Sequence, residues 1–321
     1  MRVRAAARPR TSRKALPARF AAIVLVAGAA FTAARAETLN APFDFTRGAI
    51  GLDVTVKGAP LYVMLDTGVD PSAIDIDRAR ALGLKIDRGA GGEASGVGDT
   101  RSAVIYPATI DGLAILGRPF GSFDALASDL GGLSVSYGRR LDAVLGYSFL
   151  HDKAVLIDYQ RRRVVIAGRA LDAVGAARGC RTHWVAPMRF LADDNTPILP
   201  LRLGGAHGPG TLDTGSNGSV TLFPRALDLP GVRAALAEKG EVTHSGFRGD
   251  VKSKTYVLNR PVGFGPFALP AGQVVTLGKP ASATDQRAAN IGNRLFADLK
   301  LKILLDYPAR RITFYGNCPA G

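Results

Sequence analysis

The sequence has few residues that bind metals or build disulfide frameworks. Its 321 residues include two cysteines, Cys180 and Cys318, and four histidines that stand far apart, at positions 151, 183, 207 and 244. Metal sites normally need several Cys or His ligands at close spacing. We therefore expect no metal site and no cofactor. In an oxidising compartment the two cysteines would form one disulfide, and two free buried thiols are the alternative.

The sequence also has no apolar run of the length that a membrane-spanning helix normally needs. Its N-terminal apolar run, FAAIVLVAGAAF, is shorter than the about 20 residues that a spanning helix needs. Basic residues precede this run, and the small-residue segment AARA follows it, directly before Glu37. This order is typical of a signal peptide, here residues 1–36 with cleavage after Ala36. We expect a periplasmic or secreted protein with no stable membrane anchor after cleavage; an uncleaved N-terminal anchor is the alternative.

Acidic residues are in the minority, but the excess of basic ones is concentrated in the leader. The chain has 41 Lys and Arg against 27 Asp and Glu, a net charge of +14. Residues 1–36 hold eight of the basic residues and no acidic one, so the remainder carries +6. The basic runs at 161–163 and 310–311 have no interleaved aromatic residues and stand where turns are expected. We therefore predict no nucleic-acid partner.

What the sequence does contain is an internal repeat. The segment MLDTGVDPSAI at 64–74 corresponds to TLDTGSNGSVT at 211–221, which places Asp66 and Asp213 147 positions apart. Before each DTG, two apolar segments joined by a Gly turn are typical of a β-hairpin. Three more pairs follow in the same order: SGVGD (95–99) with SGFRGD (245–250), DAVLGYSFL (142–150) with ANIGNRLFA (289–297), and AVLIDYQRRRVVI (154–166) with KILLDYPARRITF (302–314).

The repeat predicts a mostly β, two-lobed protein. We expect an N-terminal lobe at 37–175 and a C-terminal lobe at 176–321, with the chain crossing between them around 167–185. Short helices are predicted in matching places, at IDRARALGL (76–84) and PGVRAALAEKG (230–240). Asp158 and Asp306, each before a tyrosine, are interpreted as structural residues at strand ends.

The paired DTG motifs resemble those of the aspartic peptidases. In that family each DTG is followed about 80 residues later by an apolar-apolar-Gly element, and Val144-Leu145-Gly146 and Asn290-Ile291-Gly292 stand at these places. The small lobes resemble the retropepsins, and the duplicated single chain resembles pepsin. The resemblance covers residues 40–316 and implies the acid-protease β-barrel fold, endopeptidase activity on peptides or proteins, and a monomer, because one chain supplies both half-sites.

The resemblance implies that Asp66 and Asp213 are the catalytic pair. Two carboxylates that lie close together cannot both ionise easily, so they share one proton. One then deprotonates water while the other protonates the peptide carbonyl, as is general for aspartic proteases. The family pattern gives supporting roles in the active-site loops, by cross-lobe hydrogen bonding, tight turning or close packing, to Thr67, Gly68, Gly146, Thr214, Gly215, Ser216 and Gly292.

Two Gly-rich tips are candidates for covering the substrate. SGVGD resembles a flap tip, with Gly96, Val97 and Gly98 near the peptide. SGFRGD, with Phe247 and Arg248, is interpreted as a second flap or as the equivalent loop of the other lobe. Exposed turns are the alternative for both. In the pepsin-like folds that this sequence resembles, the lobe crossing and the C-terminus share one sheet. The resemblance therefore suggests that Cys180, at the crossing, and Cys318, near the C-terminus, lie close enough to pair.

The sequence departs from the family in two places. Val69 stands where Ser, Thr or Ala usually follows the Gly, so Asp66 lacks the hydroxyl that Ser216 offers to Asp213, and we expect unequal support of the two carboxylates. The tyrosine of the pepsin flap has no counterpart either. These departures favour an alternative, a non-catalytic peptide- or protein-binding protein of the same fold. The segment 37–45 is short for an inhibitory prosegment, so we expect activity without autoprocessing.

Overall fold

A computed structural model describes residues 38–93, 104–169, 175–191, 194–247, 249–279 and 286–319. The predicted leader and its cleavage site lie outside these ranges, as do Gly96, Val97, Gly98 and Arg248. Among the described residues, no helix combines the length and the apolar character that a membrane crossing requires. The chain from Ala36 onward forms one unit by its internal contacts.

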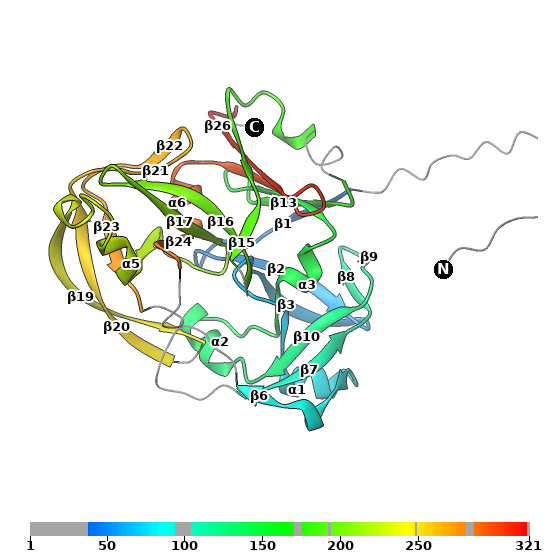
Figure 1. Ribbon diagram of the computed structural model, residues 1–321. Helices are drawn as coiled ribbons and strands as arrows, with labels where there is room; N and C mark the ends of the chain where they lie inside the picture. Colours follow the sequence, from blue (N-terminus) through cyan, green and yellow to red (C-terminus); the bar gives the residue numbers. More distant parts are fainter. Residues whose placement is uncertain are drawn as a thin grey trace, which may run out of the picture. The chain divides into compact units, whose positions relative to one another are not determined.

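The first lobe is a curled sheet whose strands come from residues 50–145 (Figure 1). Its order along the sheet is β5-β7-β10-β4-β11-β3-β2-β8-β9, with β6 paired to β7. The strands are β2 (Ile50–Val56), β3 (Ala59–Leu65), β4 (Ala73–Asp75), β5 (Lys85–Ile86), β6 (Gly92–Glu93), β7 (Val104–Ile110), β8 (Leu113–Ile115), β9 (Arg118–Pro119), β10 (Phe123–Ser128) and β11 (Ala143–Leu145).

The second lobe repeats this arrangement with residues 189–292. Its order is β19-β20-β23-β18-β24-β17-β16-β21-β22, with β15 paired to β16. The strands are β15 (Arg189–Leu191), β16 (Asp194–Leu203), β17 (Ala206–Asp213), β18 (Val220–Leu222), β19 (Leu236–Gly246), β20 (Gly249–Leu258), β21 (Val262–Phe264), β22 (Phe267–Leu269), β23 (Val274–Leu277) and β24 (Ala289–Gly292).

The two sheets correspond strand by strand, and this explains where the DTG loops lie. β3 pairs with β2 as an antiparallel hairpin and with β11 in parallel, just as β17 pairs with β16 and with β24. Because the carboxyl ends of parallel neighbours meet at one edge, Asp66 emerges beside Gly146, and Asp213 beside Gly292. The predicted mostly β, two-lobed and duplicated fold is thus confirmed; the lobe limits 37–175 and 176–321 stay a prediction.

A third sheet contains strands from both halves of the chain. Its order is β1-β13-β12-β25-β26-β14, formed by β1 (Leu39–Pro42), β12 (Ala154–Asp158), β13 (Arg163–Ala167), β14 (Thr182–Pro187), β25 (Lys302–Asp306) and β26 (Arg311–Gly316). The central β12–β25 pair joins the two repeats, and β14 at one edge pairs with β26. Cys180 and Cys318 flank this edge pair and form the expected disulfide.

The helices are short and lie between the strands. They are α1 (Ile76–Ala81), α2 (Gly131–Tyr137), α3 (Tyr147–Leu150), α5 (Pro224–Leu227) and α6 (Asn293–Asp298), with 3₁₀ turns η1 (Arg88–Ala90), η2 (Gly175–Ala177) and η3 (Arg233–Ala235). The predicted helix at 76–84 is present as α1, where the Asp75 side chain caps the first turn. The one at 230–240 is wrong: only η3 forms, and β19 begins at Leu236. Strand pairing of Leu236 with Leu258 overrides the local helix propensity here.

Candidate active site

The fold brings the two DTG carboxyl groups together. Asp66 follows the end of β3 and is 8% exposed, whereas Asp213 ends β17 and is half-buried. Their side chains are hydrogen-bonded to one another. Each DTG glycine lies against the opposite carboxyl: a Cβ at Gly215 would stand 2.0 Å from Asp66 Oδ2, and one at Gly68 would stand 3.0 Å from Asp213 Oδ1. Glycine at both places is therefore needed for the close approach.

The two loops are locked together by their threonines. The Thr67 N–H donates to Thr214 Oγ1 (3.0 Å), and the Thr214 N–H donates to Thr67 Oγ1 (3.1 Å). Each hydroxyl then donates onward across the interface, Thr67 to the Leu212 carbonyl (2.6 Å) and Thr214 to the Leu65 carbonyl (3.0 Å). Both threonines are buried. This reciprocal arrangement fixes the separation of the carboxyl groups by way of the backbone that carries them.

The environment of Asp66 favours its protonated form. Burial raises the pKa of the Asp66 carboxyl well above its ordinary value of 3.8, and the negative charge of Asp213 raises it further. The N–H groups of Gly68 and Gly215 oppose this rise in the Asp66 pKa, the first through a 2.7 Å hydrogen bond. Burial next to a like charge is the arrangement in which two carboxyl groups retain one proton between them.

Asp213 is supplied with more hydrogen-bond donors than Asp66. Its Oδ1 accepts from the N–H groups of Gly215 (2.9 Å) and Ser216 (3.0 Å). Its Oδ2 accepts from the Asn290 side-chain amide (2.6 Å). The expected inequality between the carboxylates is present, but Ser216 contributes its backbone N–H, while its hydroxyl accepts from the Gly218 N–H (3.4 Å).

Val69 occupies the position equivalent to Ser216 but packs differently. Its side chain lies against an apolar cluster that includes Met64 and Val144. Its carbonyl accepts from the Tyr147 N–H (2.8 Å) and lies against Gly146, where a Cβ would come within 2.3 Å. Gly292 is equally close to the second loop, 2.3 Å from the Gly218 carbonyl by the same measure. The two glycines thus let β11 and β24 support the loops from behind.

A further layer beneath the second loop contains residues that the sequence did not single out. Asn293 donates from its side chain to the Thr214 carbonyl and accepts from the Tyr159 hydroxyl at 2.6 Å. Burial raises the pKa of Tyr159 well above its usual value, and the charge of Asp213 adds to this. The equivalent tyrosine, Tyr307, lies under the first loop against Tyr147, and its hydroxyl has no hydrogen-bond partner among the described residues. Only comparison of the two repeats, position by position, could have suggested this layer.

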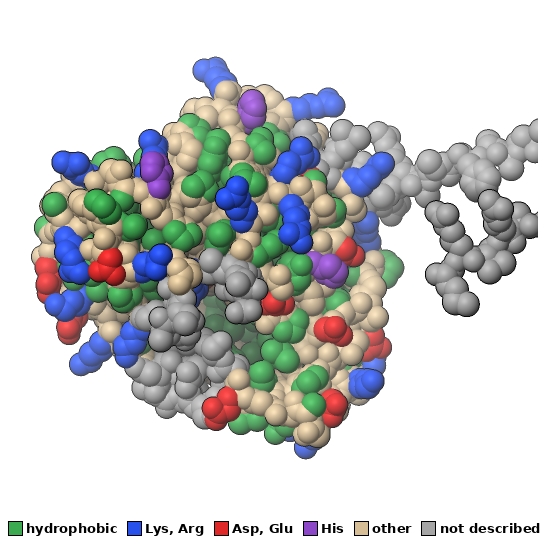
Figure 2. All heavy atoms as spheres, viewed as in Figure 1, with side chains coloured by type: hydrophobic (Ala, Val, Ile, Leu, Met, Phe, Trp, Pro, Cys, Tyr) green, Lys and Arg blue, Asp and Glu red, His purple; other side chains and the backbone are tan. Residues whose placement is uncertain are grey.

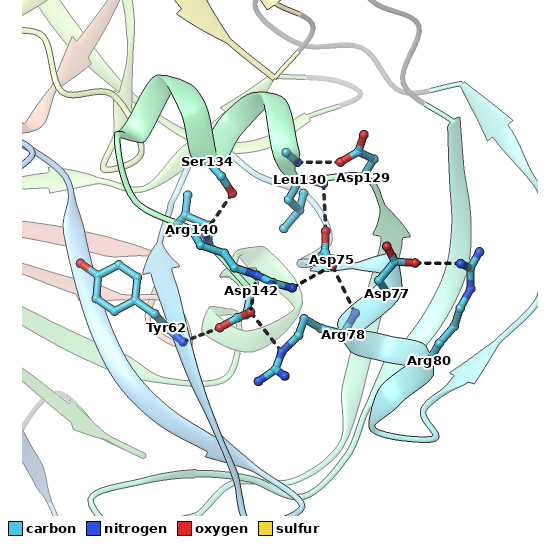
Figure 3. A network of polar contacts seen from close by, with 12 residues as sticks. Tyr62, Asp75, Asp77, Arg78, Arg80, Asp129, Leu130, Ser134, Arg140 and Asp142 are labelled. Atoms are coloured by element: carbon cyan, nitrogen blue, oxygen red, sulfur yellow. Dashed lines mark hydrogen bonds and ion pairs between the residues drawn. The ribbon is translucent and has the colours of Figure 1, made fainter.

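A polar network holds the first lobe around β11 (Figure 3). Asp142, directly before β11, accepts from the Tyr62 N–H of β3 (2.9 Å) and pairs with Arg78 of α1 (3.1 Å). Asp75 caps α1 through the Arg78 N–H (3.2 Å) and also accepts from the Leu130 N–H at the start of α2 (3.3 Å). Short helices and the strand behind the first DTG loop are thereby tied to one another.

The other residues that the sequence singled out fall into three groups. Phe247 is half-buried at the tip of the β19–β20 hairpin, and β19 contacts α2 of the first lobe (Figure 1). Gly96, Val97, Gly98 and Arg248 lie outside the described residues. Asp158 and Asp306 accept from backbone N–H groups of the turns that follow their strands, and Asp158 pairs with the buried Lys302 (3.1 Å).

Comparison with known proteins agrees with this geometry. Residues 52–149, which contain the first DTG and Gly146, match the aspartyl protease family. Residues 52–149 form an aspartyl protease domain. Asp213 lies outside the matched range, and the symmetry of the two sheets relates it to Asp66.

Two individual proteins are similar to this chain. DNA damage-inducible protein 1 of Neurospora crassa is 28% identical over 174 residues, which is 50% of the chain and 35% of that protein. The chain thus spans about a third of the length of this relative. Basic 7S globulin from soybean superposes with a TM-score of 0.47 at 11% identity, covering 87% of this chain and 94% of that one.

The described residues form no metal cluster, and the face drawn in Figure 2 shows no continuous basic stripe. Within the described ranges, no three His, Cys, Asp or Glu side chains are grouped to hold a metal ion. On the face seen in Figure 2, the coloured Lys and Arg side chains are scattered among hydrophobic and neutral ones. The predicted absence of nucleic-acid partners and of cofactors stays a prediction.

Proposed function

We propose that this protein is an exported aspartic endopeptidase that hydrolyses peptide bonds with a water molecule activated by Asp66 and Asp213. The observation that carries the proposal is the pair itself: two hydrogen-bonded carboxyl groups on symmetric loops, locked by reciprocal threonine hydrogen bonds. The protonation state favoured by burial supplies an acid and a base within one site. The aspartyl protease domain at 52–149 supports the same chemistry.

The proposed reaction needs no group beyond the pair and water. The ionised carboxylate takes a proton from water, whose oxygen bonds to the carbonyl carbon. The protonated carboxyl gives its proton to the carbonyl oxygen, which forms a neutral tetrahedral diol. Collapse of the diol breaks the C–N bond as one carboxyl gives its proton to the leaving nitrogen and the other takes a hydroxyl proton from the diol, which restores the pair.

The proposed substrate is an extended peptide or a segment of an unfolded protein. It would lie over the two DTG loops, with the β19–β20 hairpin on one side and the first lobe on the other. Phe247 at the hairpin tip offers an apolar contact for such a chain. We propose that the enzyme acts as a monomer, because one chain supplies both carboxyl groups.

The proposed location is the periplasm or the medium. The residue order of 1–36 is that of a signal peptide, and a disulfide between Cys180 and Cys318 is compatible with an oxidising compartment. Cell fractionation of the expressed protein, with N-terminal sequencing of the processed form, tests this. A mature N-terminus at Glu37 is expected, and a protein retained uncleaved in the cytoplasm would contradict export.

The activity is tested by incubating a denatured protein with purified wild type, Asp66→Asn and Asp213→Asn at acidic and neutral pH. Wild type is expected to produce fragments that neither variant produces. If wild type cleaves no more than the variants but still binds unfolded chains, the non-catalytic binding protein is the better description. Val69 is the residue that favours this second candidate, because no hydrogen bond from it to Asp66, within the described chain, matches the one that the Ser216 N–H donates to Asp213.

A further inference from the structure

The two halves of the site differ at one pair of positions beside the carboxyl groups. In the first lobe Met64 of β3 pairs with Val144 of β11, and both are buried in an apolar cluster. In the second lobe the equivalent positions, on β17 and β24, hold Thr211 and Asn290. A buried apolar pair in one repeat is thus a polar pair in the other, directly below Asp213.

The polar pair forms a short relay that ends on the carboxylate. Thr211 is fully buried, and its hydroxyl donates to Asn290 Oδ1 at 2.5 Å. Asn290 Nδ2 then donates to Asp213 Oδ2 at 2.6 Å. If the Asn290 amide were flipped by 180°, its oxygen would face a carboxylate oxygen of Asp213, and the two oxygens would repel one another. The carboxylate therefore fixes which end of the amide faces it, and the Thr211 hydroxyl, which also lies 3.3 Å from the Ala289 carbonyl, binds the amide oxygen at the other end.

The direction of this hydrogen bond has a consequence for the shared proton. An amide NH₂ group can only donate, so it stabilises Asp213 Oδ2 as an ionised acceptor. With Gly215 and Ser216 on Oδ1, both oxygens of Asp213 accept hydrogen bonds from fixed N–H groups. Within the described chain, no side-chain amide donates to Asp66, and Asp66 is the more buried of the two.

We propose that Asn290, whose amide oxygen is bound by Thr211, is a positioning residue that holds the negative charge of the pair on Asp213 and the proton on Asp66. This proposal rests on the proposed function. It assigns the roles within that reaction: Asp213 takes the proton from water, and Asp66 gives its proton to the carbonyl oxygen. The raised pKa of Asp66 agrees with this assignment.

The test compares the pH profiles of kcat/KM for wild type and Asn290→Val. This substitution gives the second lobe the same residue as Val144, which holds the equivalent position in the first lobe. Loss of a hydrogen bond to the ionised form is expected to move the acidic limb of the kcat/KM profile up by about one pH unit. At the pH optimum, kcat/KM is expected to fall about tenfold or more. A uniform fall at every pH, with the limb unmoved, would mean that Asn290 has only a structural role and would overturn the proposal.

Two further variants keep the test decisive. Thr211→Val keeps the shape and removes the hydroxyl, so a smaller shift in the same direction is expected even if Asn290→Val does not fold. Thr255→Val is the matched control, because it removes a buried hydroxyl that donates to the Gly240 carbonyl (3.1 Å) between β19 and β20 of the same sheet. The control is expected to leave the limb in place. A shift as large with Thr255→Val as with Thr211→Val would contradict the relay.

A measurement without turnover separates this proposal from the proposed function. Titration of the ¹³C-labelled aspartate carboxyl groups by NMR follows the ionisation of the pair directly in wild type and Asn290→Val. If wild type does not cleave but the variant's titration moves up by about one pH unit, the relay stands and the protease function falls. If wild type cleaves and the titration does not move, the relay falls and the function stands.

Discussion

Thr67 and Thr214 exchange backbone N–H to hydroxyl hydrogen bonds of 3.0 and 3.1 Å across 147 positions of sequence. Each hydroxyl accepts from the threonine N–H of the opposite repeat and donates to a strand carbonyl of that same opposite repeat. Removing one hydroxyl therefore leaves a buried N–H and a buried carbonyl unpaired. The pair couples the stability of the two lobes to the geometry of the carboxyl groups.

We predict that Thr67→Val and Thr214→Val each lower the free energy of unfolding by about 1–3 kcal/mol. Because the two residues are in direct contact, the first substitution already loosens the loop that the second hydroxyl binds, and the double variant should lose less than the sum of the two losses. Urea denaturation of the four proteins measures this. Thr67→Ser, which keeps the hydroxyl, is the control and should retain most of the stability; strict additivity in the double variant would contradict the reciprocal arrangement.

Asp66 makes stability depend on pH. Its pKa is raised in the folded chain, so its contribution to stability is complete below about pH 4 and is lost as the pH rises through the folded pKa. Asp66→Asn has no charge to bury, and we predict that at pH 7 it unfolds at least about 2 °C above wild type. The difference should shrink at pH 4.

Thermal unfolding at the two pH values, followed by circular dichroism, measures the Asp66 effect. Asp124→Asn removes a carboxylate from an exposed position of β10 and is the control. It should show no such dependence on pH. A variant Asp66→Asn that is less stable than wild type at pH 7 would show that the buried carboxyl is not strained in its ionised form.

The two tyrosines beneath the loops give a matched pair of variants. Tyr159→Phe leaves Asn293 Oδ1 without its donor, so we predict a loss of about 1–3 kcal/mol in the free energy of unfolding. Tyr307→Phe removes a buried hydroxyl that has no partner among the described residues, and its effect should stay within about 0.5 kcal/mol or be stabilising. Equal losses in the two variants, measured by chemical denaturation, would contradict the asymmetry.

The glycine of the second DTG should be essential for activity. A methyl group at Gly215 would overlap Asp66 Oδ2, 2.0 Å away, and must displace the carboxyl. Since a displacement of about 1 Å can cost about 100-fold in rate, we predict at least that loss of kcat/KM for Gly215→Ala. Gly121→Ala, which meets no atom within 4 Å, is the control and should keep wild-type activity. Full activity of Gly215→Ala would refute the close packing of the pair.

Much of the fold could be predicted because the chain repeats itself. One DTG is a common turn sequence. Two DTG motifs, each with a hairpin before it and a Gly element after it, indicate that the two halves of the chain have the same fold. The hairpin at Lys57 and Gly58, between β2 and β3, is where the sequence predicted it. The proximity of Cys180 and Cys318, which flank the β14–β26 pair and form the disulfide, was predicted from the family resemblance rather than from local sequence.

The parts that the sequence did not reveal depend on contacts between distant residues. Asn290 was visible as a polar residue in an otherwise apolar element, but its hydrogen bond to Asp213 depends on the parallel pairing of β24 with β17. The segment 230–240 has good helix formers, yet pairing with β20 makes its second half a strand. Ser216 was expected to act through its hydroxyl, while the turn presents its N–H instead.

The central claim is that Asp66 and Asp213 act as one catalytic pair. The most direct measurement is kcat/KM for peptide cleavage by wild type, Asp66→Asn and Asp213→Asn, with cleavage products identified by mass spectrometry. We predict cleavage by wild type and a loss of at least about 1,000-fold in each variant, because each removes either the base or the acid. Activity of wild type that persists in either variant would contradict the account.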